Sequence, residues 1–201
     1  MQANGSFEHG TLANPSDEGR VRVWDPLVRV LHWSLAAGFF GAYFTEDWET
    51  VHVWLGYAVL GIVALRVIWG FVGTRHARFT DFVRRPAVVA AYLRDLAHLR
   101  HRRYLGHNPA GGYMILALLL MVSLTGLSGI ALYAAEEHAG PMAGWVSGAW
   151  EDPLEALHEF LANFSLFLVV VHVLGVIVES LLHGENLVRA MWTGFKRGGA
   201  T

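Results

Sequence analysis

Cysteine is absent from the sequence. This absence excludes disulfide bonds, iron–sulfur clusters held by thiolates, structural zinc sites built from cysteine, covalent attachment of c-type haem and a cysteine nucleophile. It does not indicate the redox compartment in which the protein works. Any metal or cofactor that the chain binds must be held by other side chains.

Charged residues are scarce as well. They make up 16% of the chain, 54% of the residues are hydrophobic, and the mean hydropathy is positive. This balance is typical of a small membrane protein with several spans and unusual for a soluble domain. The formal net charge of -2 is too close to zero to indicate a partner. We therefore expect contact with membrane lipid and no binding of nucleic acid.

Long apolar runs, by contrast, are present. A helix needs about 20 mostly apolar residues to cross a bilayer, and four stretches qualify: residues 27–44, 51–73, 111–134 and about 154–182. Glycine recurs in all four, which membrane bundles tolerate because small residues let backbones or a flat ligand pack closely. We predict an all-α membrane protein in which residues 21–201 form one four-transmembrane-helix bundle.

The flanks and connections of these spans differ in charge. Apart from Arg66, every Lys and Arg lies within residues 20–29, 74–110 or 189–197, whereas 45–50 and 135–153 carry acidic residues and no basic ones. Basic loops are retained in the cytoplasm. We therefore predict that both termini and the 74–110 loop are cytoplasmic.

Two segments on that cytoplasmic side have local character of their own. Residues 1–20 are polar and lack the basic and apolar regions of a secretory signal, so we expect a flexible tail. Within 74–110, apolar residues of 85–103 recur at helical spacing, which favours an amphipathic helix on the anionic inner leaflet. A solvated basic connector is the alternative.

Four of the eleven histidines lie within the spans or at their ends: His32, His52, His158 and His172. The alternating direction of the spans puts His32 and His172 nearer the cytoplasm, and His52 and His158 nearer the outside. Fourteen residues, about 21 Å along a helix and close to four turns, separate His158 from His172, so both point to one face. Two pairs at two depths are what two six-coordinate haems require, since imidazoles bind iron from both faces of the porphyrin.

Other interpretations of these polar residues remain open. The same histidines suit metal transport or a proton relay, although such proteins usually add intramembrane carboxylates, and here only Glu159 and Glu179 come close. Arg66 is the single basic residue in the interior of a span, since Arg29 lies at the very start of the first. An intramembrane charge indicates a functional role, here pairing with the propionates of the inner haem. The alternative is that its side chain snorkels to the interface.

Several stretches, in this order, resemble the bacterial cytochrome b561 group, which includes the b-type cytochrome subunits of nickel–iron hydrogenases. They are VWDPLVRVLHW, HVWLGYAVLGIVALRVIWGFVGTRHARF, GHNPAGG, LHEFLANFSLFLVVVHVLGV and ENLVRAMWTGFKRG. The resemblance implies two haem b groups in the bacterial inner membrane, with His52 and His158 as the outer ligands and His32 and His172 as the inner ligands.

The resemblance also implies a function and a second site. The function is electron transfer, as a subunit of an oxidoreductase complex, between the quinone pool and a periplasmic partner, which is a hydrogenase-like oxidoreductase or a c-type cytochrome. The quinone site is expected beside GHNPAGG, where His107 and Asn108 are the candidate hydrogen-bonding groups. His107 is also expected to exchange a proton near neutral pH. An ordinary turn is the alternative for this stretch.

Within the family that the sequence resembles, one rival function is that of a free-standing superoxide:quinone oxidoreductase. The absence of basic residues from both outer connections argues against it, because superoxide is an anion. The acidic outer residues 136–155 suit docking of a basic redox partner, but they also follow simply from the exclusion of basic residues from that side. Assembly into a homo-oligomer stays open.

Overall fold

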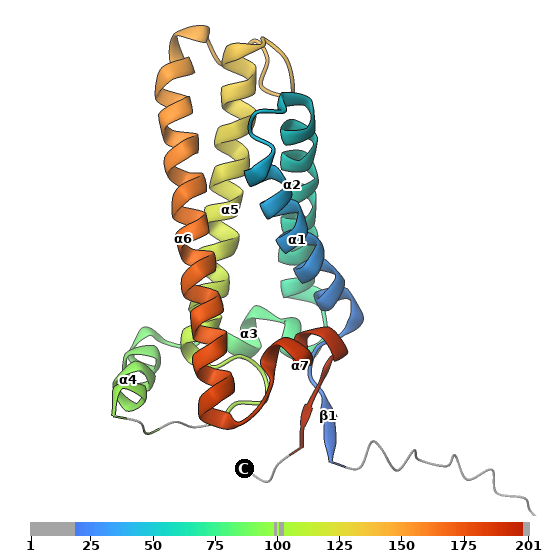
Figure 1. The fold of residues 1–201 in the computed structure, drawn as a ribbon, viewed down its shortest axis with the longest axis vertical. Coiled ribbons are helices and arrows are strands. Elements are labelled where there is room, and N and C mark those ends of the chain that lie inside the picture. Colours follow the sequence, from blue (N-terminus) through green and yellow to red (C-terminus); the bar gives the residue numbers. More distant parts are fainter. Residues whose placement is uncertain (1–18, 99, 101–102, 199–201) are drawn as a thin grey trace, which may run out of the picture.

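The chain folds into an elongated bundle of four long helices (Figure 1). This computed structural model describes residues 19–98, 100 and 103–198. The helices are α1 (Pro26–Phe44), α2 (Glu49–Val72), α5 (Pro109–Glu136) and α6 (Glu151–His183). All four are long and apolar enough to cross a membrane. The protein is therefore an all-α protein that crosses the membrane several times.

Capping residues explain why some helices begin earlier than their apolar runs. Asp25 caps α1, since its Oδ1 accepts a hydrogen bond from Val28 N at 3.0 Å, and a proline follows it. Proline suits the first helical position because its missing N–H would be unpaired there anyway. The last long helix, α6, begins at Glu151, because its acidic first turn is stabilised by the helix dipole. It ends before Gly184, which adopts the left-handed conformation (φ +57°) that glycine favours.

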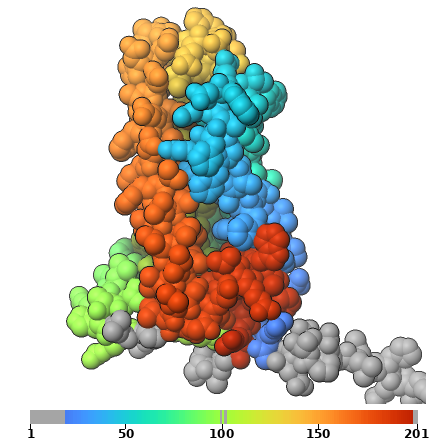
Figure 2. Space-filling model, in the orientation of Figure 1, coloured from blue at the N-terminus to red at the C-terminus, as the bar shows by residue number. Residues whose placement is uncertain are grey.

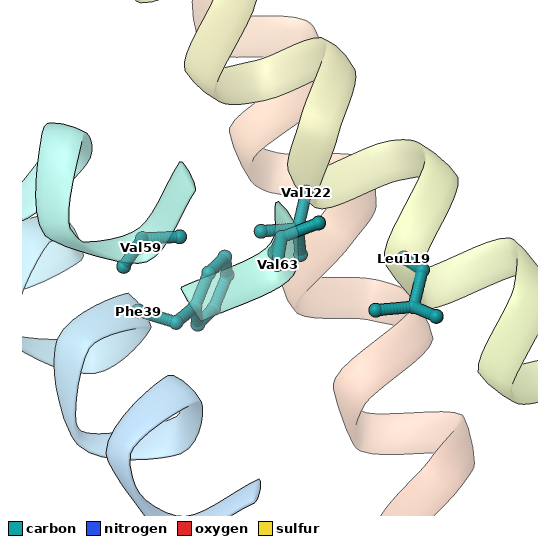
Figure 3. Packing of buried hydrophobic residues seen from close by; sticks show 5 residues of the cluster. All are labelled: Phe39, Val59, Val63, Leu119 and Val122. Carbon is teal, nitrogen blue, oxygen red and sulfur yellow. The ribbon is translucent and has the colours of Figure 1, made fainter. Parts of the chain in front are cut away.

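The four helices do not pack evenly. Helix α1 packs along α2, α5 packs along α6, and α2 with α5 joins the two pairs. A core cluster at that junction contains five buried residues (Figure 3): Phe39, Val59, Val63, Leu119 and Val122. Helices α1 and α6 meet at few points, and the space-filling view shows a hollow between them (Figure 2).

Short elements gather at the end of the bundle that carries both ends of the described chain, which we call the terminal side (Figure 1). Strand β1 (Arg20–Arg22) pairs antiparallel with β2 (Phe195–Arg197), and α7 (Leu187–Thr193) precedes β2. The opposite end, which we call the loop side, holds the α1–α2 and α5–α6 connections and the short helix η3 (Gly148–Trp150). The small sheet was not predicted from the sequence.

The long connection between α2 and α5 also lies on the terminal side. It contains η2 (Arg75–Ala77), α3 (Phe79–Phe82) and α4 (Pro86–Ala97). Helix α4 covers most of the amphipathic helix predicted within 85–103, and its contact with a lipid leaflet stays a prediction. The predicted flexible tail lies outside the described residues up to residue 18, and Arg20, which we assigned to the tail, begins β1.

Candidate functional site

The four histidines of the spans face one another in two pairs across the bundle. On the terminal side, the ring centroids of His32 in α1 and His172 in α6 are 6.5 Å apart, with 52° between the ring planes. On the loop side, the rings of His52 in α2 and His158 in α6 are 5.9 Å apart at 83°. Two imidazoles that bind one metal ion from opposite sides, with bonds of about 2 Å, have ring centroids about 6 Å apart. Both separations suit a single ion between the rings.

Hydrogen bonds orient the loop-side pair. Nδ1–H of His52 donates to the carbonyl oxygen of Ala42 at 2.9 Å. Nδ1–H of His158 faces two acceptors, the carbonyl oxygen of Thr125 at 3.0 Å and Oγ of Ser128 at 3.1 Å. A histidine that donates through Nδ1 keeps the lone pair of Nε2 for a metal. Both rings are therefore held in the tautomer that a metal requires.

A cavity of about 510 Å³ opens between these two histidines. This volume lies within the range of about 300 to 1,000 Å³ that is typical of cofactor sites. Glycines form part of its wall: Gly56, Gly126 and Gly129. A Cβ atom at Gly129 would lie 2.8 Å from Cε1 of His158, so only glycine leaves the imidazole its present place. The histidine pair, the cavity and the glycine wall fit a flat cofactor such as haem.

The terminal-side pair is organised differently. Among the described residues, Nδ1 of His32 is buried without a hydrogen-bond partner, and so is Nε1 of the neighbouring Trp33. The Trp33 ring meets the His32 ring edge-on at 5.0 Å. Buried polar atoms nearly always have partners, and each exception calls for an explanation such as an unseen ligand or water. These atoms are compatible with a bound group between α1 and α6.

Arg66 is buried at the terminal end of α2, with 8% of its surface exposed. Its Nη2 donates to the carbonyl oxygen of Ala77 at 3.3 Å, and its guanidinium lies 5.7 Å from the ring centroid of Phe79. Within the described part of the chain, Nη1 is buried and has no partner. Arg66 is thus covered by the η2–α3 segment and does not snorkel to water, which was the alternative drawn from the sequence.

His107 precedes α5 and lies between two aromatic rings. Its ring centroid is 4.5 Å from Trp24 and 4.8 Å from Phe82. Burial lowers the pKa of His107 to about 3, and the positive charges of Arg66 and Lys196 act in the same direction. The side chain is therefore neutral near pH 7, and the expected proton exchange by His107 at neutral pH is not supported. Its Nδ1 is buried and has no partner in the part of the chain that the structure describes.

Asn108 is the N-cap of α5. Its Oδ1 accepts a hydrogen bond from Gly111 N at 2.6 Å, and the following Pro109 starts the helix. This is the turn chemistry considered as an alternative from the sequence. The cap occupies the side-chain oxygen of Asn108 and not its amide N–H groups.

Several polar contacts near the pairs had no clear signal in the sequence. Oη of Tyr43 donates to Oδ1 of Asn163 at 2.9 Å and bridges α1 and α6 beside the loop-side cavity. On the terminal side, His76 contacts Asp81, and Arg103 pairs with Glu185 at 3.1 Å. These partners come from different elements, so helical periodicity does not reveal them.

Each pair offers two candidate ligands, its two histidines, in the part of the chain that the structure describes. Within residues 19–98, 100 and 103–198, no group of three or more His, Cys, Asp or Glu side chains is placed to hold a metal ion. A bare divalent metal normally takes three or four protein ligands. A haem iron takes four nitrogens from the porphyrin and needs only the two axial ligands from the protein.

Comparison with protein-family models identifies the family of this chain. The model of the prokaryotic cytochrome b561 family matches residues 23–194. The chain belongs to the prokaryotic cytochrome b561 family. Membership implies a b-type haem as cofactor, and this cytochrome b561 family member is a multi-pass membrane protein with an electron-transfer role.

Curated relatives of this cytochrome b561 family member carry the name "Probable Ni/Fe-hydrogenase B-type cytochrome subunit". The protein of Rhizobium leguminosarum bv. viciae is 26% identical over 162 residues, which cover 72% of this chain and 66% of the relative. That of Azotobacter vinelandii is 29% identical over 163 residues, with the same coverage of 72% and 66%. That of Rhodobacter capsulatus is 24% identical over 214 residues, covering 88% of this chain and 81% of the relative.

The chain thus spans slightly less than two thirds of the length of the first two relatives. The comparison with solved structures found no match.

Proposed function

We propose that the protein carries electrons through two haem b groups between a redox partner outside a bacterial inner membrane and the quinone pool within it. The observation that supports this most directly is the placement of four imidazoles in two pairs, with ring centroids 6.5 and 5.9 Å apart. In this proposal, His32 and His172 are the axial ligands of one haem, and His52 and His158 are those of the other.

The haems would supply the one-electron chemistry, and the chain supplies orientation and a low-dielectric surround. On the loop side, the carbonyl oxygens of Ala42 and Thr125 keep the two imidazoles in the ligating tautomer. On the terminal side, the unpartnered Nη1 of buried Arg66 supports a role in binding a haem propionate. A buried guanidinium is stable only when its donors are satisfied, and a carboxylate is its strongest partner.

The charge pattern supports the orientation of this electron path. The terminal side carries the arginines of β1, the α2–α5 connection and β2, and the loop side carries carboxylates. The positive-inside rule then assigns the terminal side, with α4 on the inner leaflet, to the cytoplasm. The loop-side haem would exchange electrons with the periplasmic partner. The relatives named as hydrogenase subunits favour a hydrogenase, and a c-type cytochrome is the alternative partner.

Quinone is proposed to bind on the terminal side near His107 and Asn108. Support comes from Nδ1 of His107, which is buried and has no partner among the described residues. As a neutral imidazole, His107 offers one hydrogen bond to a quinone oxygen and no charge. Asn108 offers its amide N–H groups, because its oxygen caps α5.

The rival functions are less well supported. Carboxylates surround the loop-side cavity and would repel the superoxide anion: Glu46, Glu49, Glu136, Glu155 and Glu159. A histidine-based metal carrier without haem does not agree with family membership or with the two protein ligands at each pair.

Haem analysis of the purified protein tests the proposal. We expect two haem b per chain by the pyridine haemochrome assay, and rapid reduction of both by a short-chain quinol. A preparation without a Soret band after haem is supplied during expression would contradict the haem assignment. Two haems that a quinol does not reduce would contradict the quinone assignment alone.

A further inference from the structure

His76 and Asp81 form a carboxylate–imidazole pair on the terminal side. Nδ1 of His76 in η2 lies 2.9 Å from Oδ2 of Asp81 in α3, and the two side chains are 18% and 22% exposed. Nδ1–H of His76 donates to the carboxylate, so Nε2 is left to take up or release a proton. The electron-transfer role described above does not use either residue.

The pair packs against the loop that leads into α5. A Cβ atom at Gly106 would lie 3.0 Å from Nδ1 of His76 and 3.4 Å from Oδ2 of Asp81. Glycine at this position therefore lets both groups approach the backbone directly before His107. Phe82, the neighbour of Asp81, packs on the His107 ring at 4.8 Å. The pair thus borders the proposed quinone site and also reaches water.

Quinone chemistry at this site needs a proton carrier. Reduction of one quinone to quinol consumes two electrons and two protons, and quinol oxidation releases them. The two residues proposed to bind quinone do not provide this, because the pKa of His107 is lowered to about 3 by burial and the Asn108 amide does not titrate. Histidine is the side chain that ordinarily gains and loses a proton between pH 5 and 8.

We infer that the His76–Asp81 pair exchanges protons between the proposed quinone site and the water on the terminal side. This inference rests on the proposed function. During quinone reduction, two electrons arrive from the partner through the haems, and each proton leaves Nε2 of His76 for a quinone oxygen, directly or through water. Water on the terminal side then protonates Nε2 again. In quinol oxidation the protons move in the opposite direction.

The surrounding charges suit this role. The Asp81 carboxylate accepts from Nδ1–H of His76 and holds the orientation of the imidazole, as a carboxylate does for a catalytic histidine. Arg75 lies 3.6 Å from the other oxygen of Asp81 and is 80% exposed, so it contacts the carboxylate from the solvent side. Nη2 of Arg84 donates to the backbone oxygen of Asp81 at 2.7 Å. Two further positive charges lie close by: Nζ of Lys196 donates to the carbonyl oxygen of Gly106 at 3.4 Å, and Nη2 of Arg66 donates to that of Ala77 at 3.3 Å. The nearby His107 is neutral.

A second carboxylate–imidazole group on the terminal side serves as the comparison. Oη of Tyr92 in α4 donates to Glu179 in α6, and Nδ1 of His183 lies 3.2 Å from the other Glu179 oxygen. Burial and Glu179 both raise the pKa of Tyr92, so the phenol stays protonated and holds α4 against α6. We assign this group a structural role.

Stopped-flow reduction of the haems by duroquinol tests the inference in the purified, haem-loaded full chain. Asp81→Asn and His76→Gln keep hydrogen-bonding side chains but remove the titration of the pair. General acid–base groups contribute about 10²-fold or more when no substitute exists, and with water nearby we expect about a tenfold slower rate at pH 7. We also expect the dependence of the rate between pH 6 and 8 to flatten. Haem content and reduction by dithionite, which needs no proton, should be unchanged.

Glu179→Gln is the matched control, and its rate per haem should stay within about twofold of wild type. Wild-type rates and pH dependence in both Asp81→Asn and His76→Gln would overturn the inference, as would a rate loss confined to Glu179→Gln. Rates are compared per haem, so a variant with lower haem content remains informative. If duroquinol fails to reduce the wild-type haems, the proposed quinone function itself is wrong.

Discussion

The two histidine pairs are set into the bundle in different ways. On the loop side, Nδ1 of His52 and Nδ1 of His158 both meet backbone oxygens, and a cavity lies between the rings. On the terminal side, Nδ1 of His32 is buried without a partner in the described residues. The loop-side imidazoles are therefore oriented by the helices alone, whereas the helices leave Nδ1 of His32 on the terminal side without a partner in the described residues. If both pairs bind haem as we propose, the loop-side site is preformed and the terminal-side site would be completed by its cofactor.

Removal of a ligand should separate the two sites completely. His158→Ala should abolish the loop-side haem and His172→Ala the terminal-side haem, because a haem held by two axial ligands loses an iron–nitrogen bond in each case. Redox titration of the purified variants should then show one haem instead of two. Retention of two haems in either variant would show that the pairs are wrongly assigned.

Gly129→Ala should damage only the loop-side site. The added Cβ would lie 2.8 Å from Cε1 of His158, whose ring is held by Thr125 and Ser128 and cannot move without losing those bonds. Changes to groups that orient a ligand typically cost about 10- to 100-fold in affinity for the metal, and we expect a loss in this range by haem titration of the apo-protein.

Gly61→Ala provides the control for that substitution. In the described part of the chain, no atom beyond the adjoining backbone of α2 lies within 4 Å of a Cβ at Gly61, so alanine should leave the haem affinity unchanged. Equal haem affinity in the two alanine variants would mean that the wall at Gly129 does not shape the site.

The terminal side should be the more sensitive to acid. Burial alone would raise the pKa of Glu185, but hydrogen bonds from Arg197 N and Arg103 lower it below its ordinary value of 4.5. A lowered folded-state pKa stabilises the fold above the ordinary value, and this contribution disappears as the pH falls through the folded-state value. Hydrogen exchange of the β1–β2 sheet should therefore accelerate below about pH 4.5 before that of the loop-side helix ends.

Glu185→Gln tests the origin of this acid sensitivity. At pH 7 the substitution should destabilise the β1–β2 sheet by about 2 kcal/mol, since hydrogen bonds to charged groups contribute about 1.5 to 3 kcal/mol. At a pH below the lowered pKa of Glu185, the variant and the wild type should exchange at similar rates. A difference that persists at low pH would assign the effect to packing and not to charge.

Ser128→Ala should have the smallest effect. It removes one of two acceptors from Nδ1–H of His158 and leaves the Thr125 carbonyl oxygen in place. We expect haem to stay bound with at most about a tenfold loss of affinity, the lower end of the range for such outer partners. Ser123→Ala is the matched control, because among the described residues Oγ of Ser123 bonds the backbone of its own helix at Leu119 and no other group. A larger loss of haem affinity in Ser128→Ala than in Gly129→Ala would show that the Ser128 hydrogen bond matters more to the site than the space at Gly129.

The sequence predicted the long helices and the shared face of His158 and His172 well. It predicted the contacts between distant segments poorly. Apolar runs and caps are local signals, so α1 and α2 begin and end within about two residues of the predicted spans. The predicted start of α6 was three residues late, because the apolar run does not include its acidic first turn. The pairing of β1 with β2 could not be predicted, because strands of three residues carry no usable pattern.

The candidate polar residues illustrate the same limit. Arg66 was recognised as unusual because charge is rare in a span, but its burial depends on the η2–α3 segment folding back over it. His107 looked suited to proton exchange, but Trp24 and Phe82 enclose it and remove that ability. In each case a residue's chemistry was visible in the sequence and its environment was not.

By itself, the sequence determined that this protein crosses the membrane several times and that His158 and His172 share one face of a helix, because hydropathy and helical repeat are properties of continuous segments. Only the tertiary structure decided how Nδ1 of His158 is bonded, that Arg66 is buried and that His76 meets Asp81 beside Gly106. Those features arise where separate elements meet, and burial and hydrogen bonding at such contacts depend on distances that no single segment specifies.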